Sequence, residues 1–197
     1  VETLFKTSSD TVVGYANDAY KTAGMSANEY METVTSFSAS LLASMNNDTA
    51  AAAEKANVAI TDMSDNANKM GTDISLIQNA YNGFAKQNYT MLDNLKLGYG
   101  GTKEEMQRLL DDASKLSGIK YDISSYSDVV DAIHVVQTEM GITGTTAKEA
   151  STTIEGSVSS MSSAWDNWVA GMADSEANFS QLTSHCYDTV YQIACKL

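Results

Sequence analysis

Hydrophobic residues recur along most of this chain at intervals of three and four positions, whereas strict alternation with polar residues is nearly absent. Intervals of three and four positions place side chains on one face of an α-helix, so the pattern predicts an all-α fold with no sheet. The clearest stretch follows Gly24, where the apolar positions are Tyr30, Val34, Phe37, Leu41 and Met45.

Capping residues and glycines divide this pattern into seven or eight amphipathic helices joined by short Gly, Asn and Ser loops, either jointed or bundled. Asp48 is an expected N-cap, and Gly71 and Gly118 are expected C-terminal stops. Three pairs have the spacing of a capping box: Ser26 with Glu29, Thr102 with Glu105, and Thr146 with Glu149. The helices expected from these signals are Glu2–Thr22, 26–45, 49–70, 74–84, 102–117, Ser125–Met140, 146–172 and Ser175–Leu197, with a joint at Asn88–Gly101.

Each expected helix has an apolar face. After Met45 these faces comprise Ala52, Ala56, Ala59, Ile60, Met63, Ala67 and Met70; Ile74, Ile77, Tyr81 and Phe84; Met106, Leu109, Leu110, Ala113 and Leu116; Val129, Ile133, Val136 and Met140; Ile154, Val158, Met161, Trp165, Trp168 and Met172; and Phe179, Leu182, Cys186, Val190, Ile193 and Leu197.

Composition supports a long helical chain and excludes some functions. None of the 197 residues is proline, the residue that most strongly interrupts helices. The formal charge of −13 argues against direct binding of nucleic acid, which requires clustered Lys and Arg. No apolar run approaches the roughly 20 residues of a membrane span, and the N-terminus lacks a signal-peptide pattern. Because the first residue is Val1, we expect the chain to be a fragment of a longer protein.

The sequence GYGGTK, from Gly98 to Lys103, is the strongest candidate for a phosphate-binding loop. A P-loop requires Gly, four residues and then Gly-Lys-Ser/Thr after a strand, and this order is not present. The dinucleotide fingerprint also fails, because Lys103 occupies the position of its third glycine. We therefore interpret the segment as a glycine turn before a capped helix.

Other reactive side chains form no clear catalytic or metal site. His134 is expected to be a semi-buried or surface histidine. His185, Cys186 and Cys195 could supply three metal ligands, but a fourth is missing and one helix would turn Cys195 away, so both cysteines are interpreted as reduced. Trp165 and Trp168 are expected to pack in the core or against a partner, with a ligand-binding aromatic patch as the alternative. No catalytic, cofactor-binding or metal residue is therefore assigned, and we expect no enzyme activity.

Several long segments resemble the tail tape measure proteins of long-tailed bacteriophages and prophages. They are VTSFSASLLASM (34–45), ITDMSDNANKMGTDISLIQNAY (60–81), GFAKQNYTMLDNLKLGYGGTKEEMQRLLDDASKLSGIKYDI (83–123), VVDAIHVVQTEMGITGTTAKEASTTIEGSVSSM (129–161) and AWDNWVAGMAD (164–174). The resemblance divides the chain into a tape-measure-like region, 1–174, and a C-terminal helix, 175–197, that matches the family less well.

The resemblance implies a structural role. A tape measure protein is helical, occupies the lumen of the tail tube, sets tail length during assembly and leaves before DNA ejection. Its implied partners are the tail tube protein, tail assembly chaperones and tail-tip or baseplate proteins, together with self-association. Its implied location is the virion tail, and the host bacterial cytoplasm during assembly.

Two other functions remain open at this stage. The chain could be a stand-alone helical bundle that serves as an interaction module of a bacterial surface or signalling protein. A weaker alternative is a hydrolase built from scattered carboxylates, which would require a pocket holding two close acids with strongly shifted pKa values.

Overall fold

The structure is a computed structural model that describes residues 1–152, 154–172 and 191, and within them it is built from helices and contains no strand. The all-α prediction is thereby confirmed. The helices are α1 (Glu2–Phe5), η1 (Lys6–Ser8), α2 (Ser9–Thr22), α3 (Ala27–Ser44), α4 (Thr49–Met70), α5 (Ile74–Phe84), η2 (Leu92–Leu95), α6 (Lys103–Ser117), α7 (Tyr126–Glu139), α8 (Thr145–Thr152) and α9 (Ile154–Met172), where η marks a 3-10 helix.

The expected capping signals account for both ends of α4 and α6 and for the start of α3. Ser26 and Glu29 form both bonds of their capping box at the start of α3. The Asp48 carboxylate accepts the N–H groups of Ala50 and Ala51, each at 3.1 Å, at the start of α4. Gly71 ends α4 with φ +61°, a left-handed conformation that glycine adopts without a steric penalty. Local sequence chemistry therefore determines where these helices begin and end.

Three predicted helix boundaries were wrong. The expected helix Glu2–Thr22 is interrupted by η1, where Lys6 has φ 48°. The expected capping box of Thr146 and Glu149 does not start a helix, because α8 begins at Thr145 and Thr146 is already inside it. The expected single helix 146–172 is observed as two, α8 and α9. The expected helix 175–197 lies outside the described residues, apart from Tyr191.

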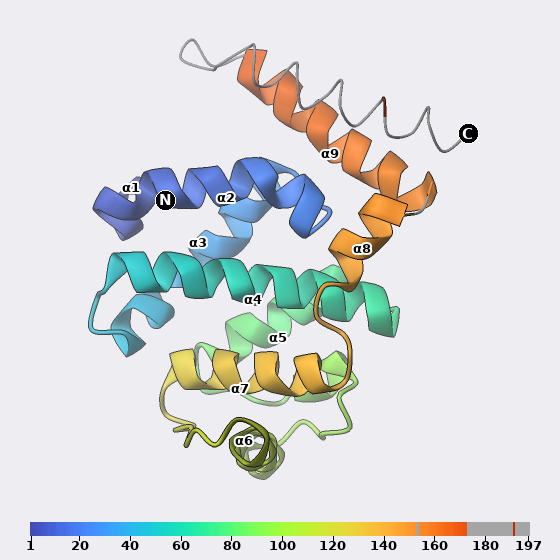
Figure 1. Cartoon of the computed structure of the whole chain (residues 1–197). Coiled ribbons are helices and arrows are strands. Elements are labelled where there is room, and N and C mark those ends of the chain that lie inside the picture. Colours follow the sequence, from blue (N-terminus) through green and yellow to red (C-terminus); the bar gives the residue numbers. More distant parts are fainter. Residues whose placement is uncertain (153, 173–190, 192–197) are drawn as a thin grey trace.

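Helix α4 runs through the middle of the bundle and contacts α1, α2, α3, α5, α7 and α8 (Figure 1). Helix α2 lies on one side of it and α7 on the other with α6 beyond, while α3 crosses α4 and also contacts α5 and α7. A single core joins Phe5 of α1 to Ile142 after α7, and its largest fully buried side chains include Tyr30, Tyr81 and Phe84. None of the helices that the structure describes is long and apolar enough to cross a membrane.

Among the described residues of the predicted apolar faces, most are buried or partly buried and three are exposed. Leu116 near the end of α6 is 50% exposed, Met140 after α7 is 44% exposed, and Trp165 on α9 is 53% exposed. Leu116 and Met140 follow the helical spacing, but Leu116 lies in the last turn of α6 and Met140 directly follows the last residue of α7. Their predicted burial was therefore wrong. Periodicity shows which face of a helix is apolar, but it does not show how far along the helix a neighbouring element covers that face.

Candidate functional site

The glycine loop before α6 is a structural turn. The Thr102 hydroxyl accepts the N–H of Glu105 at 3.2 Å and caps α6, as the sequence predicts. Glu105 completes only half of the expected capping box, because its carboxylate turns to the N–H of Gly100 at 3.0 Å and to Arg108. The hydrogen bond from Arg108 holds the pKa of Glu105 below its usual value. The Glu105 carboxylate therefore already accepts the N–H of Gly100, a loop donor that would otherwise be open to a phosphate.

Buried polar side chains on α4 form the most unusual feature of the core. Asp62, Asp65 and Asn66 are each at most 1% exposed, although they flank Met63 on a helix that the sequence predicts to have only a narrow apolar stripe. They are buried because α4 is enclosed by other helices on several sides. We call Asp62, Asp65 and Asn66 the α4 polar cluster.

Each member of the α4 polar cluster bonds a different part of the chain. The Asp62 carboxylate contacts Nδ1 of His134 on α7 at 2.9 Å. The Asn66 amide donates to the carbonyl of Leu95 in η2 at 3.0 Å. Asp65 accepts two backbone N–H groups at the start of α8, from Gly144 at 2.6 Å and from Thr146 at 2.8 Å. The cluster thus joins α4 to three segments that follow it in the sequence.

Asp65 also explains why the predicted capping box at Thr146 was wrong. The first N–H groups of a helix need acceptors, which local Ser, Thr, Asp or Asn side chains usually supply. Here the acceptor comes from α4, and its negative charge lies at the positive end of α8. The Thr146 hydroxyl is left without a hydrogen-bond partner.

The pair formed by Asp62 and His134 has the geometry of an ion pair. The hydrogen bond that His134 donates to the Asp62 carboxylate raises the pKa of His134 above its ordinary value, and burial raises the pKa of Asp62. An adjacent ion pair joins Lys55 of α4 to Asp131 of α7 at 2.5 Å. A hydrolytic triad would also require a nucleophile bonded to the second ring nitrogen of His134. The contacts with Asp62 are made by Nδ1 of His134, and they join α7 to α4.

We expect His134→Gln to remove a pH-dependent part of the stability. Because the pKa of His134 is raised in the folded chain, the pair stabilises fully below the unfolded pKa of about 6.5, and the contribution is lost as pH rises through the folded pKa. The His134 side chain is 38% exposed, so we expect only about 0.5–1 kcal/mol at about pH 6 and close to zero at about pH 9. Urea unfolding of both proteins measures this difference. A wild-type advantage that is constant across this range would contradict the assignment.

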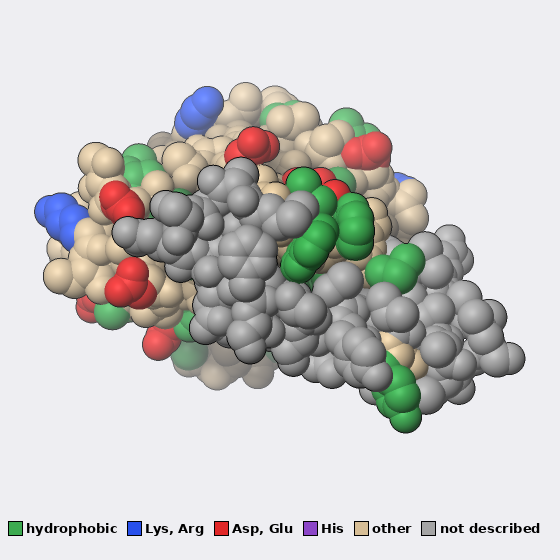
Figure 2. Space-filling view, turned by 90° about the horizontal axis from the view of Figure 1, so that it is seen from above, with side chains coloured by type: hydrophobic (Ala, Val, Ile, Leu, Met, Phe, Trp, Pro, Cys, Tyr) green, Lys and Arg blue, Asp and Glu red, His purple; other side chains and the backbone are tan. Residues whose placement is uncertain are grey.

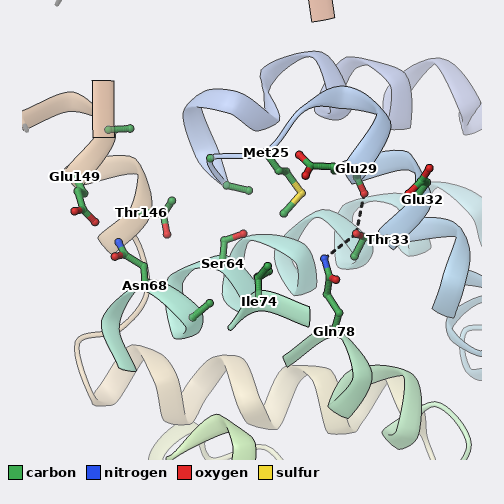
Figure 3. Close-up of a pocket in the computed structure, with 14 residues that line it drawn as sticks. Met25, Glu29, Glu32, Thr33, Ser64, Asn68, Ile74, Gln78, Thr146 and Glu149 are labelled. Atoms are coloured by element: carbon green, nitrogen blue, oxygen red, sulfur yellow. Dashed lines mark hydrogen bonds between the residues drawn. The ribbon is translucent and has the colours of Figure 1, made fainter. Parts of the chain in front are cut away.

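A cleft of about 590 Å³ lies between the α2–α3 turn, α4, α5 and α8 (Figure 3). Its charged lining residues are Glu29, Glu32 and Glu149, and its apolar lining includes Met25 and Ile74. Neither Asp62 nor Asp65 is among the lining residues. The two most buried acids of this region therefore face His134 and α8 and not the cleft.

Among the described side chains of α9, some contact the bundle and others are exposed. Ser163 donates to the carbonyl of Gly24 at 3.3 Å, and the Asn167 carbonyl oxygen accepts the N–H of Ala27 at 2.7 Å. On the outer face Trp165 lies against Trp168 with ring centroids 5.0 Å apart, and Val169 is 44% exposed. Seen from the side of α9, the surface carries exposed hydrophobic side chains (Figure 2). The tryptophans therefore do not pack in the core among the described residues.

The remaining sequence candidates are placed only in part. His185, Cys186 and Cys195 lie outside the described residues. Within the described part of the chain no group of three or more His, Cys, Asp or Glu side chains is arranged to hold a metal ion.

The fold and its contacts define this protein as an all-α bundle with a central helix joined to later segments by buried polar contacts. Comparison of the chain with known protein families, with curated protein sequences and with solved structures gave no match.

Proposed function

We propose that this chain is a structural part of a phage tail, a region of the tape measure that sets tail length and occupies the tube lumen until DNA is ejected. The observation that carries the proposal is the position of the tape-measure-like segments within the fold. Val34, Ile60 and Leu109 come from three of those segments, and each is fully buried in the same core. The resemblance therefore lies on residues that determine the fold.

The shape of the chain favours a bundled region of a longer ruler. As a single helix, the 197 residues would span about 300 Å at a rise of about 1.5 Å per residue. The longest helix in the described part of the chain is α4, whose 22 residues correspond to about 33 Å by the same rise. A folded bundle adds little length per residue to the ruler. We therefore propose that this region serves mainly as a contact surface within the tail.

The exposed surface suits contacts with protein partners. Trp165 and Val169 on α9 offer apolar area for the tube protein, an assembly chaperone, a tail-tip protein or another copy of the chain. The formal charge of −13 disfavours adhesion to DNA that follows through the same tube.

Tail length tests this proposal. In the phage or prophage that carries the gene, we expect an in-frame duplication of residues 1–172 to lengthen the tail by far less than the roughly 260 Å of a continuous helix of that length. The matched control inserts an uninterrupted helical segment of equal length, which should lengthen the tail by the full rise. Electron microscopy measures both. If the control insertion left the tail length unchanged, that result would contradict a tape-measure role.

A second function is favoured by the extent of the core. Because buried side chains run from Phe5 to Ile142, the region has the core of an independently folding domain, as a stand-alone interaction module of a bacterial surface or signalling protein would. That function predicts normal tails when the gene is deleted, whereas the tape-measure function predicts absent or aberrant tails.

A further inference from the structure

We propose that the cleft between the α2–α3 turn, α4, α5 and α8 is a binding site for a linear aliphatic polyamine, with carboxylates for its terminal ammonium groups and hydroxyls for its interior amine. This site is independent of the proposed tail function. Four features of the cleft support it: the separation of its acids, its apolar middle, its unpartnered hydroxyls and its charge.

The acids lie at opposite ends of the cleft. Glu29 and Glu32 project from α3 at one end, and Glu149 projects from α8 at the other (Figure 3). One oxygen of Glu29 is occupied by Ser26 in the capping box, while Glu32 is exposed at the rim. Two separated negative ends fit an extended ligand that carries a positive charge at each end.

The middle of the cleft is apolar. Met25 covers it from the α2–α3 turn, Ile74 lies opposite at the start of α5, and Ala67 adds a small side chain from α4. The methylene groups between two ammonium groups would contact these side chains and would thereby be removed from water. A compact cation such as Mg²⁺ has no apolar part to match this surface.

The wall of the cleft holds two hydroxyl groups that lack hydrogen-bond partners. Ser64 on α4 is 5% exposed and its Oγ has no partner, and the buried Oγ1 of Thr146 on α8 has none either. Figure 3 shows Ser64 between the two acidic ends, directed toward the space under Met25. A buried hydroxyl without a partner is costly, and an interior secondary ammonium can donate to it.

The charge of the lining selects cations. Lys and Arg are absent from the lining residues described for the cleft, which include three glutamates. At one end the amide of Gln78 donates to the Thr33 hydroxyl at 3.0 Å, and this hydroxyl donates to the carbonyl of Glu29 at 2.8 Å. These bonds hold the α3 and α5 walls together through the main-chain carbonyl of Glu29 and not through its carboxylate.

Isothermal titration of the full chain with spermidine tests the site. We expect saturable binding of one spermidine per chain, with affinity about tenfold higher than for the linear diamine of equal length that has a methylene in place of the interior amine. Ser64→Ala should remove that preference and leave the unfolding midpoint unchanged or higher, because the hydroxyl has no partner to lose.

Charge variants separate the site from general attraction to an acidic protein. Glu32→Gln with Glu149→Gln should weaken spermidine binding by about tenfold or more. The matched control, Glu2→Gln with Glu104→Gln, removes two exposed carboxylates that do not line the cleft and should change affinity by less than about twofold. Equal weakening by both pairs, the absence of saturable binding, or equal affinity for the diamine would overturn the proposal.

Discussion

Gly101→Ala is expected to destabilise the fold by at least about 3 kcal/mol, because a methyl group at this position would overlap backbone atoms. A Cβ placed on Gly101 would lie 2.2 Å from the carbonyl oxygen of Thr90 and 2.9 Å from its carbonyl carbon. Both atoms belong to the main chain and cannot rotate away, so the loop before α6 would have to move.

The neighbouring Gly100 provides the control for this substitution. A Cβ at Gly100 would meet only Cγ of Glu105 at 3.5 Å, an ordinary contact. Gly100→Ala should therefore be neutral, or stabilise by up to about 1 kcal/mol by restricting the unfolded chain. Thermal and urea unfolding of the two variants compare them directly. If Gly101→Ala were as stable as Gly100→Ala, the close approach of Gly101 to Thr90 would not exist in solution.

Asp65→Ala is expected to cost about 3 kcal/mol and to loosen α8 from the bundle. The carboxylate is fully buried and accepts the N–H groups of Gly144 and Thr146, so its removal leaves two donors without an acceptor. Hydrogen bonds to charged groups contribute about 1.5–3 kcal/mol each, and burial prevents water from replacing them fully. Faster amide hydrogen exchange at residues 144–152 should accompany the loss of stability.

Asp48→Ala is the matched control, because Asp48 also accepts two helix N–H groups but is exposed. Water can solvate those groups after the substitution, so the expected cost is about 1 kcal/mol, the usual value for an N-cap. Urea unfolding measures both variants. Equal costs for the two substitutions would show that burial of Asp65 adds nothing to its bonds with α8.

The difference between these two aspartates illustrates how much of the fold local sequence predicts. Asp48 precedes an Ala-rich helix, and its role as a cap follows from its position alone. Asp65 lies in the middle of α4, where an aspartate is ordinarily solvated. Its role as the cap of α8 depends on a contact between residues about 80 positions apart, which no local pattern contains.

The candidate site was less predictable than the helices for the same reason. Of the expected stripe on α4, from Ala52 to Met70, the positions up to Met63 are buried, whereas Ala67 and Met70 are only partly buried. The sequence around Met63 contains a weak signal for the α4 polar cluster, since Asp62, Asp65 and Asn66 lie directly beside the apolar stripe of the helix. Polar residues beside a stripe are usually solvent-exposed, so the signal gains meaning only when α4 is known to be enclosed.

The sequence by itself determined the all-α character of the described residues, the caps at Ser26, Asp48 and Thr102, and the glycine turn before α6, because each depends on residues a few positions apart. Tertiary structure alone decided that α4 is central, that Asp62 meets His134, and that glutamates of α3 and α8 face a common cleft. Such contacts join segments separated by many residues, and the energies of local periodicity and capping carry no information about which segments meet.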